Sequence, residues 1–361
     1  MTDAEAMARA LELARRGWGR VAPNPLVGAV LVREGRLLAE GYHAEFGGEH
    51  AEIRALGDCA DPSGATCVVT LEPCAHHGKT PPCADALVAA GVARVVFALP
   101  DPDPVAGGGA ARLRQAGIEV AEGVGRLDAA ALNAPFLWSR LRPERPFVAL
   151  KMATSLDGFV ADRSGASQWI SGPDAREYAH WLRAGFDAVA VGRGTAVADD
   201  PALTVRGSVA PRVAPTRVVF ARDGELPQTL KLVRTARDQR TVIFVRPEAE
   251  ARVRRSLAGR EVAVRAASDL GAALRDLAAQ GVASILVEGG GTLATALLDA
   301  DLVDRVHWIQ APRWLGDGRR AFGRRTPTAL GDARAWTVTE RRALGPDTLL
   351  VIDRELCLRE S

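Results

Sequence analysis

Hydrophobic positions in the first part of the chain alternate between helical and strand-like spacing. After Thr2 and Glu5, which have the spacing of a capping box, apolar residues recur with a helical period until Gly17. Short apolar runs bounded by Gly, Pro or charged residues then predict strands. The predicted strands are Val27 to Val32, Arg36 to Ala39, Thr66 to Leu71 and Arg94 to Leu99, the predicted helices are His50 to Leu56 and Cys83 to Ala90, and Ala110 to Val120 is a helix-strand unit. This alternation predicts an α/β layer in which helices cover a sheet.

The same alternation restarts after a charged, proline-rich segment. Ala129 to Arg140 is predicted as one helix, and residues 142–146 (Arg-Pro-Glu-Arg-Pro) are the best candidate for a linker. Beyond it, strands are predicted at Phe147 to Met152, Ala188 to Val191, Arg217 to Phe220, Val242 to Val245, Val262 to Val264, Ser284 to Val287, Val303 to Ile309, Trp336 to Thr339 and Thr348 to Ile352, with helices at Pro173 to Ala184, Glu248 to Leu257 and Asp269 to Ala279.

Length and charge narrow the classes of protein. The chain has 361 residues, and domains of roughly 150 residues then predict two domains, which the linker places at 1–142 and 147–361. A net charge of +2 gives no reason to expect nucleic acid or an acidic membrane as a partner. The longest uncharged run, Val21 to Val32, is too short to span a bilayer, which needs about twenty residues. The charged N-terminus lacks a secretory signal, so we expect a cytoplasmic protein.

The strongest chemical signal is a set of zinc-ligand residue types. His50-Ala51-Glu52 is followed by Pro73-Cys74 and then by Cys83. Catalytic zinc takes three protein ligands and leaves one position open, and His50, Cys74 and Cys83 supply three. Zinc deaminases show His-x-Glu followed by Pro-Cys-x-x-Cys, in which the glutamate carries protons and does not bind the metal. Here eight residues separate the cysteines instead of two. Zinc lowers the pKa of a bound water to about 7, so we expect Glu52 to act as its general acid and base.

Other interpretations of these residues remain open. His50 and Glu52 alone are typical of the exposed start of a helix. Cys74 and Cys83 alone would also suit half of a closed structural zinc site, with His76 and His77 as the two missing ligands or with His76 in place of a cysteine. A structural site has no use for Glu52, which favours the catalytic interpretation. The other cysteines, Cys59, Cys67 and Cys357, have no partner spacing and are expected to be buried.

The first part of the chain resembles the deaminase half of a bifunctional riboflavin-biosynthesis deaminase/reductase family. The resemblance rests on residues 23–30 (Pro-Asn-Pro-Leu-Val-Gly-Ala-Val), 41–43 (Gly-Tyr-His), 48–52 and the insert at 73–83 that ends in Thr-Pro-Pro-Cys. It implies a cytidine-deaminase-like three-layer α/β/α domain. It further implies that Asn24 contacts the pyrimidine and that His43, His76 and Lys79 contact the base or the ribose phosphate. Asp103 stands where the family usually carries Asn, at a position expected to be structural.

The second part resembles the reductase half of the same family. Lys151 to Gly158, Ser167 to Ile170, Gly192 to Arg206 and Glu288 to Leu293 carry this resemblance, which with the first half covers nearly the full chain. The glycines after Glu288 lie between a predicted strand and helix, where backbone amides can approach a phosphate. They do not fit Gly-x-Gly-x-x-Gly, so alone they would more often indicate a tight connection. The family implies a dihydrofolate-reductase-like α/β domain that uses NADPH.

By this resemblance, each motif of the second half carries part of a binding site. The cofactor is lined by Ala153, Trp169, Thr195, Asp199, Gly290, Gly291, Thr292, Leu293, Ala294, Thr295 and Ala296. The substrate is lined by Ser167, Arg183, Leu203, Arg206 and Glu288, while Lys151 faces its ribose. Arg183 and Arg206 are suited to clamp a phosphate. Trp169 would pack on the nicotinamide or in a core, and Lys151 and Glu288 would position the reacting ribose.

One departure concerns the cofactor. The family commonly shows Asp and a small polar residue after the strand at Arg217 to Phe220, where this chain has Ala221 and Arg222. No cofactor contact is therefore assigned to Ala221. Because Arg suits phosphate, we hypothesise that Arg222 pairs with the 2′-phosphate of NADPH.

Together these features predict an enzyme for consecutive steps of riboflavin synthesis that requires Zn²⁺ and NADPH. The resemblance implies zinc-hydroxide deamination of 2,5-diamino-6-(5-phosphoribosylamino)pyrimidin-4(3H)-one, then reduction of the ribosyl group of 5-amino-6-(5-phosphoribosylamino)uracil to ribityl. Partners are then these small pyrimidine ribose phosphates and a second copy of the chain, as a dimer or tetramer formed through the reductase half. The alternatives are a zinc deaminase of another base with an unrelated partner domain, or a binding module with structural zinc.

Overall fold

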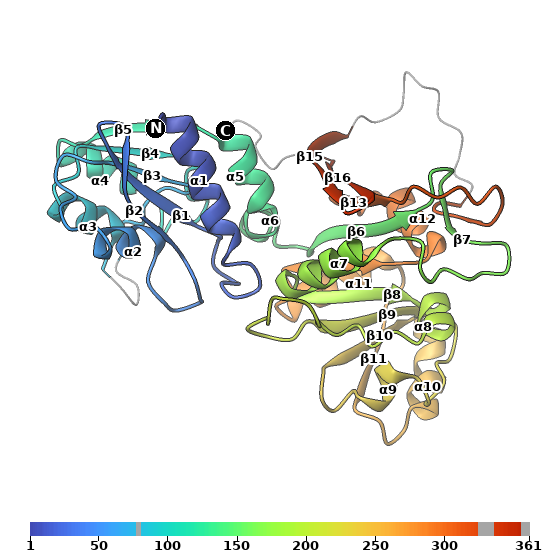
Figure 1. Ribbon diagram of the computed structural model, residues 1–361. Helices are drawn as coiled ribbons and strands as arrows, with labels where there is room; N and C mark the ends of the chain where they lie inside the picture. The colour runs from blue at the N-terminus through green and yellow to red at the C-terminus, as the bar shows by residue number, and fades with distance from the viewer. Residues whose placement is uncertain (77–80, 324–335, 355–361) are drawn as a thin grey trace. The chain divides into compact units, whose positions relative to one another are not determined.

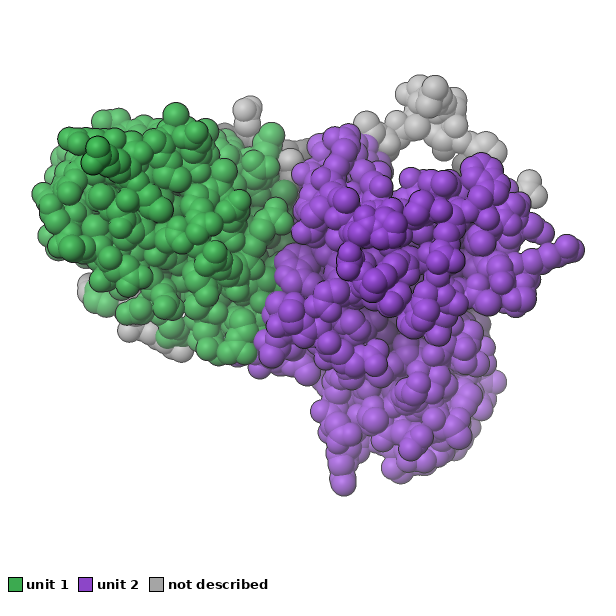
Figure 2. Space-filling model, viewed as in Figure 1, with its two compact units in different colours: residues 1–141, 356–361 green, residues 142–355 purple. Residues whose placement is uncertain are grey.

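The computed structural model describes residues 1–76, 81–323 and 336–354. These residues divide into two compact units, the first ending at Leu141 and the second beginning at Arg142 (Figure 2). The change of unit therefore falls at the start of the proline-rich segment.

The first unit is built on a five-stranded sheet in the order β2-β1-β3-β4-β5. β1 pairs antiparallel with both β2 and β3, whereas β3, β4 and β5 are parallel. The carboxyl ends of β3 and β4 therefore lie at one edge, where loops build a site. The strands are β1 (Gly28–Arg33), β2 (Arg36–Tyr42), β3 (Thr66–Val69), β4 (Arg94–Phe97) and β5 (Glu119–Glu122).

Helices cover both faces of this sheet (Figure 1). One hydrophobic cluster joins one face to α1 (Asp3–Arg15), α5 (Arg126–Leu132) and α6 (Ala134–Leu141). A second cluster joins the opposite face to α2 (Ala51–Gly57), α3 (Cys83–Ala89) and α4 (Gly109–Gln115). The expected three-layer α/β/α architecture is thereby confirmed. The capping box is also present, because the side chains of Thr2 and Glu5 each accept the other's backbone N–H.

The helix predicted over Ala129 to Arg140 is wrong in one respect, because it is divided into α5 and α6 at Asn133. The buried Asn133 side chain accepts a hydrogen bond from the Leu26 N–H at 2.8 Å and donates one to the Leu26 carbonyl at 2.9 Å. These bonds join residues 107 positions apart. Local periodicity carries no information about such a distant partner.

The second unit contains a nine-stranded sheet in the order β11-β10-β9-β8-β12-β6-β13-β16-β15. Strands from β11 to β13 are parallel, and β16 and β15 continue the sheet antiparallel. The strands are β6 (Phe147–Thr154), β8 (Ala188–Gly192), β9 (Thr216–Arg222), β10 (Thr241–Val245), β11 (Val262–Ala266), β12 (Ser284–Glu288), β13 (Arg305–Gln310), β15 (Thr337–Leu344) and β16 (Asp347–Asp353). The short strands β7 (Phe159–Ala161) and β14 (Arg319–Arg320), which were not predicted, form a separate ribbon.

Helices lie on both faces of the larger sheet as well. α11 (Leu270–Ala279) and α12 (Gly291–Asp299) pack into the hydrophobic cluster on one face. α7 (Pro173–Gly185) covers the opposite face, where Tyr178 contacts His307 of β13. The remaining helices are α8 (Arg193–Asp199), α9 (Lys231–Arg234) and α10 (Pro247–Ser256), of which α8 and α9 were not predicted. Within the described ranges, no helix has the length and apolar character needed to cross a membrane.

Replacing Asn133 by Ala tests the tie between the α5–α6 junction and Leu26. We expect a loss of about 2–4 kcal/mol from the free energy of unfolding of the first unit, because two buried backbone groups lose their partners. Calorimetry of the full chain measures this loss, with the transition of the first unit identified by its shift on zinc addition. Leu127→Ala, an exposed change on the same helix, is the control and should cost less than about 0.5 kcal/mol. Equal effects of the two changes would contradict the assignment.

Candidate functional site

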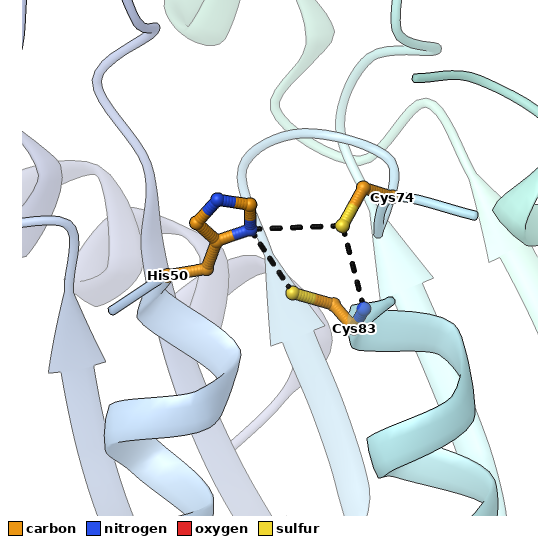
Figure 3. A group of neighbouring side chains, drawn as sticks. All are labelled: His50, Cys74 and Cys83. Atoms are coloured by element: carbon orange, nitrogen blue, oxygen red, sulfur yellow. Dashed lines mark hydrogen bonds between the residues drawn. The ribbon is translucent and has the colours of Figure 1, made fainter. Parts of the chain in front are cut away.

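Three side chains with zinc-ligand chemistry converge in the first unit (Figure 3). Nδ1 of His50 lies 3.2 Å from Sγ of Cys83 and 3.6 Å from Sγ of Cys74, and the donor atoms of the three residues all lie within 4.8 Å of one another. His50 immediately precedes α2, Cys83 is the first residue of α3, and Cys74 lies in the loop after β3. One nitrogen and two sulfur donors at this spacing fit a Zn²⁺ ion.

The surroundings of Cys74 and Cys83 shift the pKa values of their thiols in opposite directions. Hydrogen bonds from the Cys83 thiol, from His50 and from the Cys83 backbone N–H lower the pKa of Cys74 to about 4. The same shared proton and burial raise the pKa of Cys83. The proton shared by the two sulfurs therefore favours the thiolate at Cys74 over that at Cys83. Zn²⁺ binding replaces that proton, since thiolate is the ligand.

Glu52 lies two residues after His50, in the same site. Its side chain is buried in the first turn of α2, and burial raises the pKa of the carboxyl group above its ordinary value. Glu52 lines the cavity beside His50 and Cys74 but is not among the converging donors. A buried carboxyl group beside three zinc-ligand residue types suits the predicted role of Glu52 as a proton carrier.

Asn24 and His43 form an oriented pair on the cavity wall. His43 Nδ1 donates to the Glu49 carbonyl at 2.9 Å, and burial lowers the pKa of the ring, which is therefore neutral. Its Nε2 must then accept, so the Asn24 Nδ2 amide donates to it at 3.1 Å. The Asn24 Oδ1 atom is left as the acceptor, which suits an amino or N–H group of a pyrimidine.

The cavity around these residues has a volume of about 320 Å³, which is sufficient for a small ligand. Asn24, His43, His50, Glu52, Cys74 and His76 all line it. The buried Nδ1 atom of His76 has no hydrogen-bond partner in the described part of the chain. Lys79 and His77 lie outside the described residues. His76 is not one of the converging donors, so the described residues supply three ligands and not a closed set of four.

The cavity also contains residues that the sequence analysis did not select. Asp101 and Glu72 line it, and burial raises the pKa of Asp101. Asp103, expected to be structural, does shape a turn by accepting the Val105 N–H, but it also lines the cavity. A useful signal was available for Asp101, because it closely follows the carboxyl end of β4, next to β3 in the parallel part of the sheet.

The candidate residues of the second unit gather around the carboxyl ends of its central parallel strands. Lys151 and Ala153 lie on β6, Glu288 ends β12, and Thr195 and Asp199 lie on α8 directly after β8. The others come from α7, the loops on either side of α7 and α8, and the start of α12, and are Ser167, Trp169, Arg183, Leu203, Arg206 and residues 290–296. Ligands of α/β sheets bind at this edge.

Lys151, Glu288 and Arg183 form the charged centre of this region. Arg183 donates from Nε and Nη2 to the two carboxylate oxygens of Glu288 at 2.5 and 2.9 Å, and from Nη1 to the Thr204 carbonyl at 2.9 Å. Burial opposes ionisation of Glu288, but the charges of Arg183 and Lys151 outweigh it and lower its pKa. Burial lowers the pKa of Lys151. The Arg183 fork is thus directed at Glu288, so its role as a phosphate clamp stays a prediction.

The start of α12 fits the phosphates of a dinucleotide. Among the described residues, the N–H groups of Gly291, Thr292 and Leu293 have no acceptor, as expected for a first helical turn. A Cβ on Gly291 would come within 2.7 and 2.8 Å of the carbonyl oxygens of Arg320 and Ala321, so the close packing requires glycine. Leu293, Ala294 and Thr295 are buried, so Ala296 and the earlier residues form the accessible surface of this segment.

Trp169 is not a core residue. Its side chain is 61% exposed, and the Arg176 guanidinium lies 4.7 Å from the ring centroid. The core interpretation is therefore wrong, and stacking on a nicotinamide stays a prediction.

Comparisons with known proteins match both units. The family described as the RibD C-terminal domain matches residues 146–350, and the cytidine and deoxycytidylate deaminase zinc-binding region matches residues 1–99. The riboflavin biosynthesis protein RibD of Escherichia coli strain K12 is 42% identical over 369 residues, covering 97% of this chain and 99% of that protein. The chain belongs to the RibD family. RibD of Aquifex aeolicus is 39% identical over 88% of each chain.

Solved structures of RibD proteins match this chain along nearly its whole length. A diaminohydroxyphosphoribosylaminopyrimidine deaminase/5-amino-6-(5-phosphoribosylamino)uracil reductase from Thermotoga maritima has a TM-score of 0.80 at 34% identity, covering 97% of this chain and 98% of that one. Acinetobacter baumannii RibD in its form 1 has a TM-score of 0.79 at 37% identity with the same coverage. The expected cytidine-deaminase-like and dihydrofolate-reductase-like folds of a RibD protein are thereby confirmed.

Replacing Glu52 by Gln tests the division of labour in the RibD deaminase site. We expect zinc content to be unchanged, since the three donors remain, while deaminase kcat falls about 10²- to 10⁴-fold because the proton carrier is lost. Metal analysis and ammonia release measure the two quantities. NADPH oxidation with the deaminated substrate serves as an internal control and should not change. Loss of zinc, or retention of deamination, would contradict the role of Glu52.

Proposed function

We propose that this chain catalyses two consecutive steps of riboflavin synthesis, a hydrolytic deamination followed by a reduction. Its RibD membership over both units, together with the convergence of His50, Cys74 and Cys83, supports this conclusion. We assign the deaminase to residues 1–142 and the reductase to residues 147–361. The substrates are the diaminopyrimidine ribose phosphate and the uracil product that it yields.

In the deaminase, His50, Cys74 and Cys83 would hold Zn²⁺, and the bound ion would supply a Lewis acid that lowers the pKa of water to near neutrality. Asn24, oriented by His43, accepts a hydrogen bond from the pyrimidine and fixes the ring in the cavity. Glu52 carries the two protons of the attacking water in turn. The first goes to the ring nitrogen as the water oxygen bonds to the ring carbon, and the second goes to the amino group, which leaves as ammonia when its C–N bond breaks. The buried position of Glu52 keeps this proton transfer away from bulk water.

In the reductase, bound NADPH supplies a hydride, and the residues of the chain position the ribose. The amides at the start of α12, with Thr195 and Asp199, hold the cofactor. Lys151 and Glu288 face the ribose and bring its C1′ atom, in the ring-opened form, into reach. Ser167, Leu203 and Arg206 line the rest of the substrate site.

The setting of the enzyme follows from its chemistry. Among the described residues, Cys59, Cys67, Cys74 and Cys83 form no disulfide, which suits a reducing compartment, so we place the enzyme in the cytoplasm. We also propose a homodimer or homotetramer formed by the reductase unit, whose outermost strand β15 ends the sheet. Analytical ultracentrifugation of the full chain decides between these states and a monomer.

Coupling between the two activities is the direct test of this function. With the diaminopyrimidine substrate, we expect NADPH oxidation to require zinc, because the reductase receives only deaminated substrate. With the uracil substrate, we expect oxidation to survive zinc removal. Absorbance at the NADPH band measures both. If NADPH is oxidised neither with the diaminopyrimidine nor with the uracil substrate, the reductase assignment and the pathway are both overturned.

Cofactor choice gives a second test. Arg222 ends β9 with its side chain 73% exposed, 4.0 Å from Asp223. We expect Arg222→Gln to raise the KM for NADPH roughly threefold to fivefold, which is the effect of losing one exposed charge pair. The KM for NADH, which lacks the 2′-phosphate, should be unchanged. Arg237→Gln, which removes another exposed arginine from this unit, is the control. An unchanged ratio of the two KM values would exclude a contact between Arg222 and the 2′-phosphate.

A further inference from the structure

Three side chains at three-residue intervals on α7 hold the backbone of the segment that follows α8. Glu177 Oε1 accepts the Ser208 N–H at 2.8 Å, and His180 Nδ1 accepts the Arg206 N–H at 3.2 Å. Arg183 Nη1 donates to the Thr204 carbonyl at 2.9 Å. Residues three apart lie on one helix face, so one face of α7 binds every second residue of segment 204–208.

The contact is close along its whole length. A Cβ atom on Gly207 would lie 2.9 Å from Glu177 Oε1 and 2.9 Å from the Cβ atom of His180. The His180 Cβ is fixed to the helix and cannot move away, so residue 207 must be glycine for the segment to lie here. The segment is therefore seated on α7 by both packing and hydrogen bonds.

His180 contributes to this contact in one protonation state. A backbone N–H can only donate, so Nδ1 of His180 must carry a lone pair, and the ring is neutral with its proton on Nε2. The charged groups around the ring are Arg183 on its own helix, Arg206 on the held segment, Glu288 at the end of β12 and Glu177. Burial, with Arg183 and Arg206, outweighs the acids and lowers the pKa of His180, which keeps the ring neutral.

The same helix also holds the centre of the reductase site. Arg183, one turn beyond His180, makes the two-pronged contact to Glu288, which lies beside Lys151 across the β12–β6 pair. α7 therefore sets the distance between Glu288 and the backbone of Arg206. The hydrogen bond of His180 to the Arg206 N–H is separate from the contact between Arg183 and Glu288, so it can be changed while that contact keeps both its residues.

We propose that His180 is a positioning residue of the reductase, whose neutral imidazole fixes the backbone of Arg206 and so places the Arg206 guanidinium for the substrate phosphate. This role rests on the proposed function, in which the substrate of the second unit carries that phosphate. His180 itself acts through Nδ1. A competing role, direct contact of Nε2 with the substrate, predicts the opposite ranking of variants.

Two substitutions separate the two nitrogens. His180→Asn keeps an acceptor at the place of Nδ1, and His180→Gln places one near Nε2 and removes it from Nδ1. We expect His180→Gln to raise the KM for the uracil substrate about three- to tenfold, the effect of one hydrogen bond. His180→Asn should stay within about twofold of the wild-type KM, since it retains that bond. For both variants, kcat, the KM for NADPH and zinc-dependent deamination should be unchanged.

The pH dependence of KM provides a further readout. When Nδ1 of His180 is protonated it can no longer accept the hydrogen bond from the Arg206 N–H. As pH falls below 6.5, the wild-type KM should rise through two titrations, that of the substrate phosphate, with a pKa of about 6, and that of His180. His180→Asn should show the phosphate titration alone. The ratio of the wild-type KM to the His180→Asn KM should therefore grow as pH falls.

Hydrogen exchange at the Arg206 amide completes the experiment, since it needs no substrate. Faster exchange in His180→Gln than in His180→Asn is expected from the loss of the Nδ1 acceptor. Two results would overturn the role of His180 and leave the proposed function standing. One is that both variants are active with the wild-type KM, and the other is that His180→Asn has a higher KM than His180→Gln. A wild-type chain that fails to oxidise NADPH with the uracil substrate overturns the proposed function and this role with it, whatever the exchange result.

Discussion

The first unit is organised by the need to bring one imidazole and two thiols within 4.8 Å of one another. Two helices begin at this point, since His50 immediately precedes α2 and Cys83 opens α3, while Cys74 arrives from the end of β3. The partial positive charges at the N-termini of these two helices favour thiolate over thiol. Both helices lie in the same layer of the sandwich. The sheet therefore serves as the frame that holds the ligands at a fixed spacing.

The second unit depends on a different contact, the buried pair of Arg183 and Glu288. Removing either partner would leave an uncompensated charge in the interior, which is costly. The pair ties a helix on one side of the sheet to the end of a central strand, and Lys151 lies beside it. The unit thereby keeps the Lys151 ammonium group near the Glu288 carboxylate, whose hydrogen bonds go to Arg183 instead.

Sequence reasoning succeeded where the determining contacts are local. The capping box at Thr2, the strand at Val27 to Val32 and the helix after Pro173 depend on neighbours in the chain, and the zinc donors are recognisable by their side-chain chemistry. It failed where a distant partner decides. Asn133 interrupts a helix because Leu26 needs its hydrogen bonds. His180 escaped notice because its partner, the Arg206 backbone N–H, carries no side-chain signal. The site roles carried over by resemblance remain predictions, and Lys79 lies outside the described residues.

The hydrogen bonds between Asn133 and Leu26 also decide where the chain can be cut to separate the deaminase from the reductase. Sheet topology alone would suggest that the fold of the first unit is complete at β5, near residue 122. A gene split placed there would remove α5, α6 and Asn133, exposing the apolar face of β1, β3 and β4 that these helices cover. Leu26, two residues from Asn24, would lose both backbone partners. A free-standing deaminase must therefore carry its chain through α6, so the two final helices belong to the catalytic module and not to the connection.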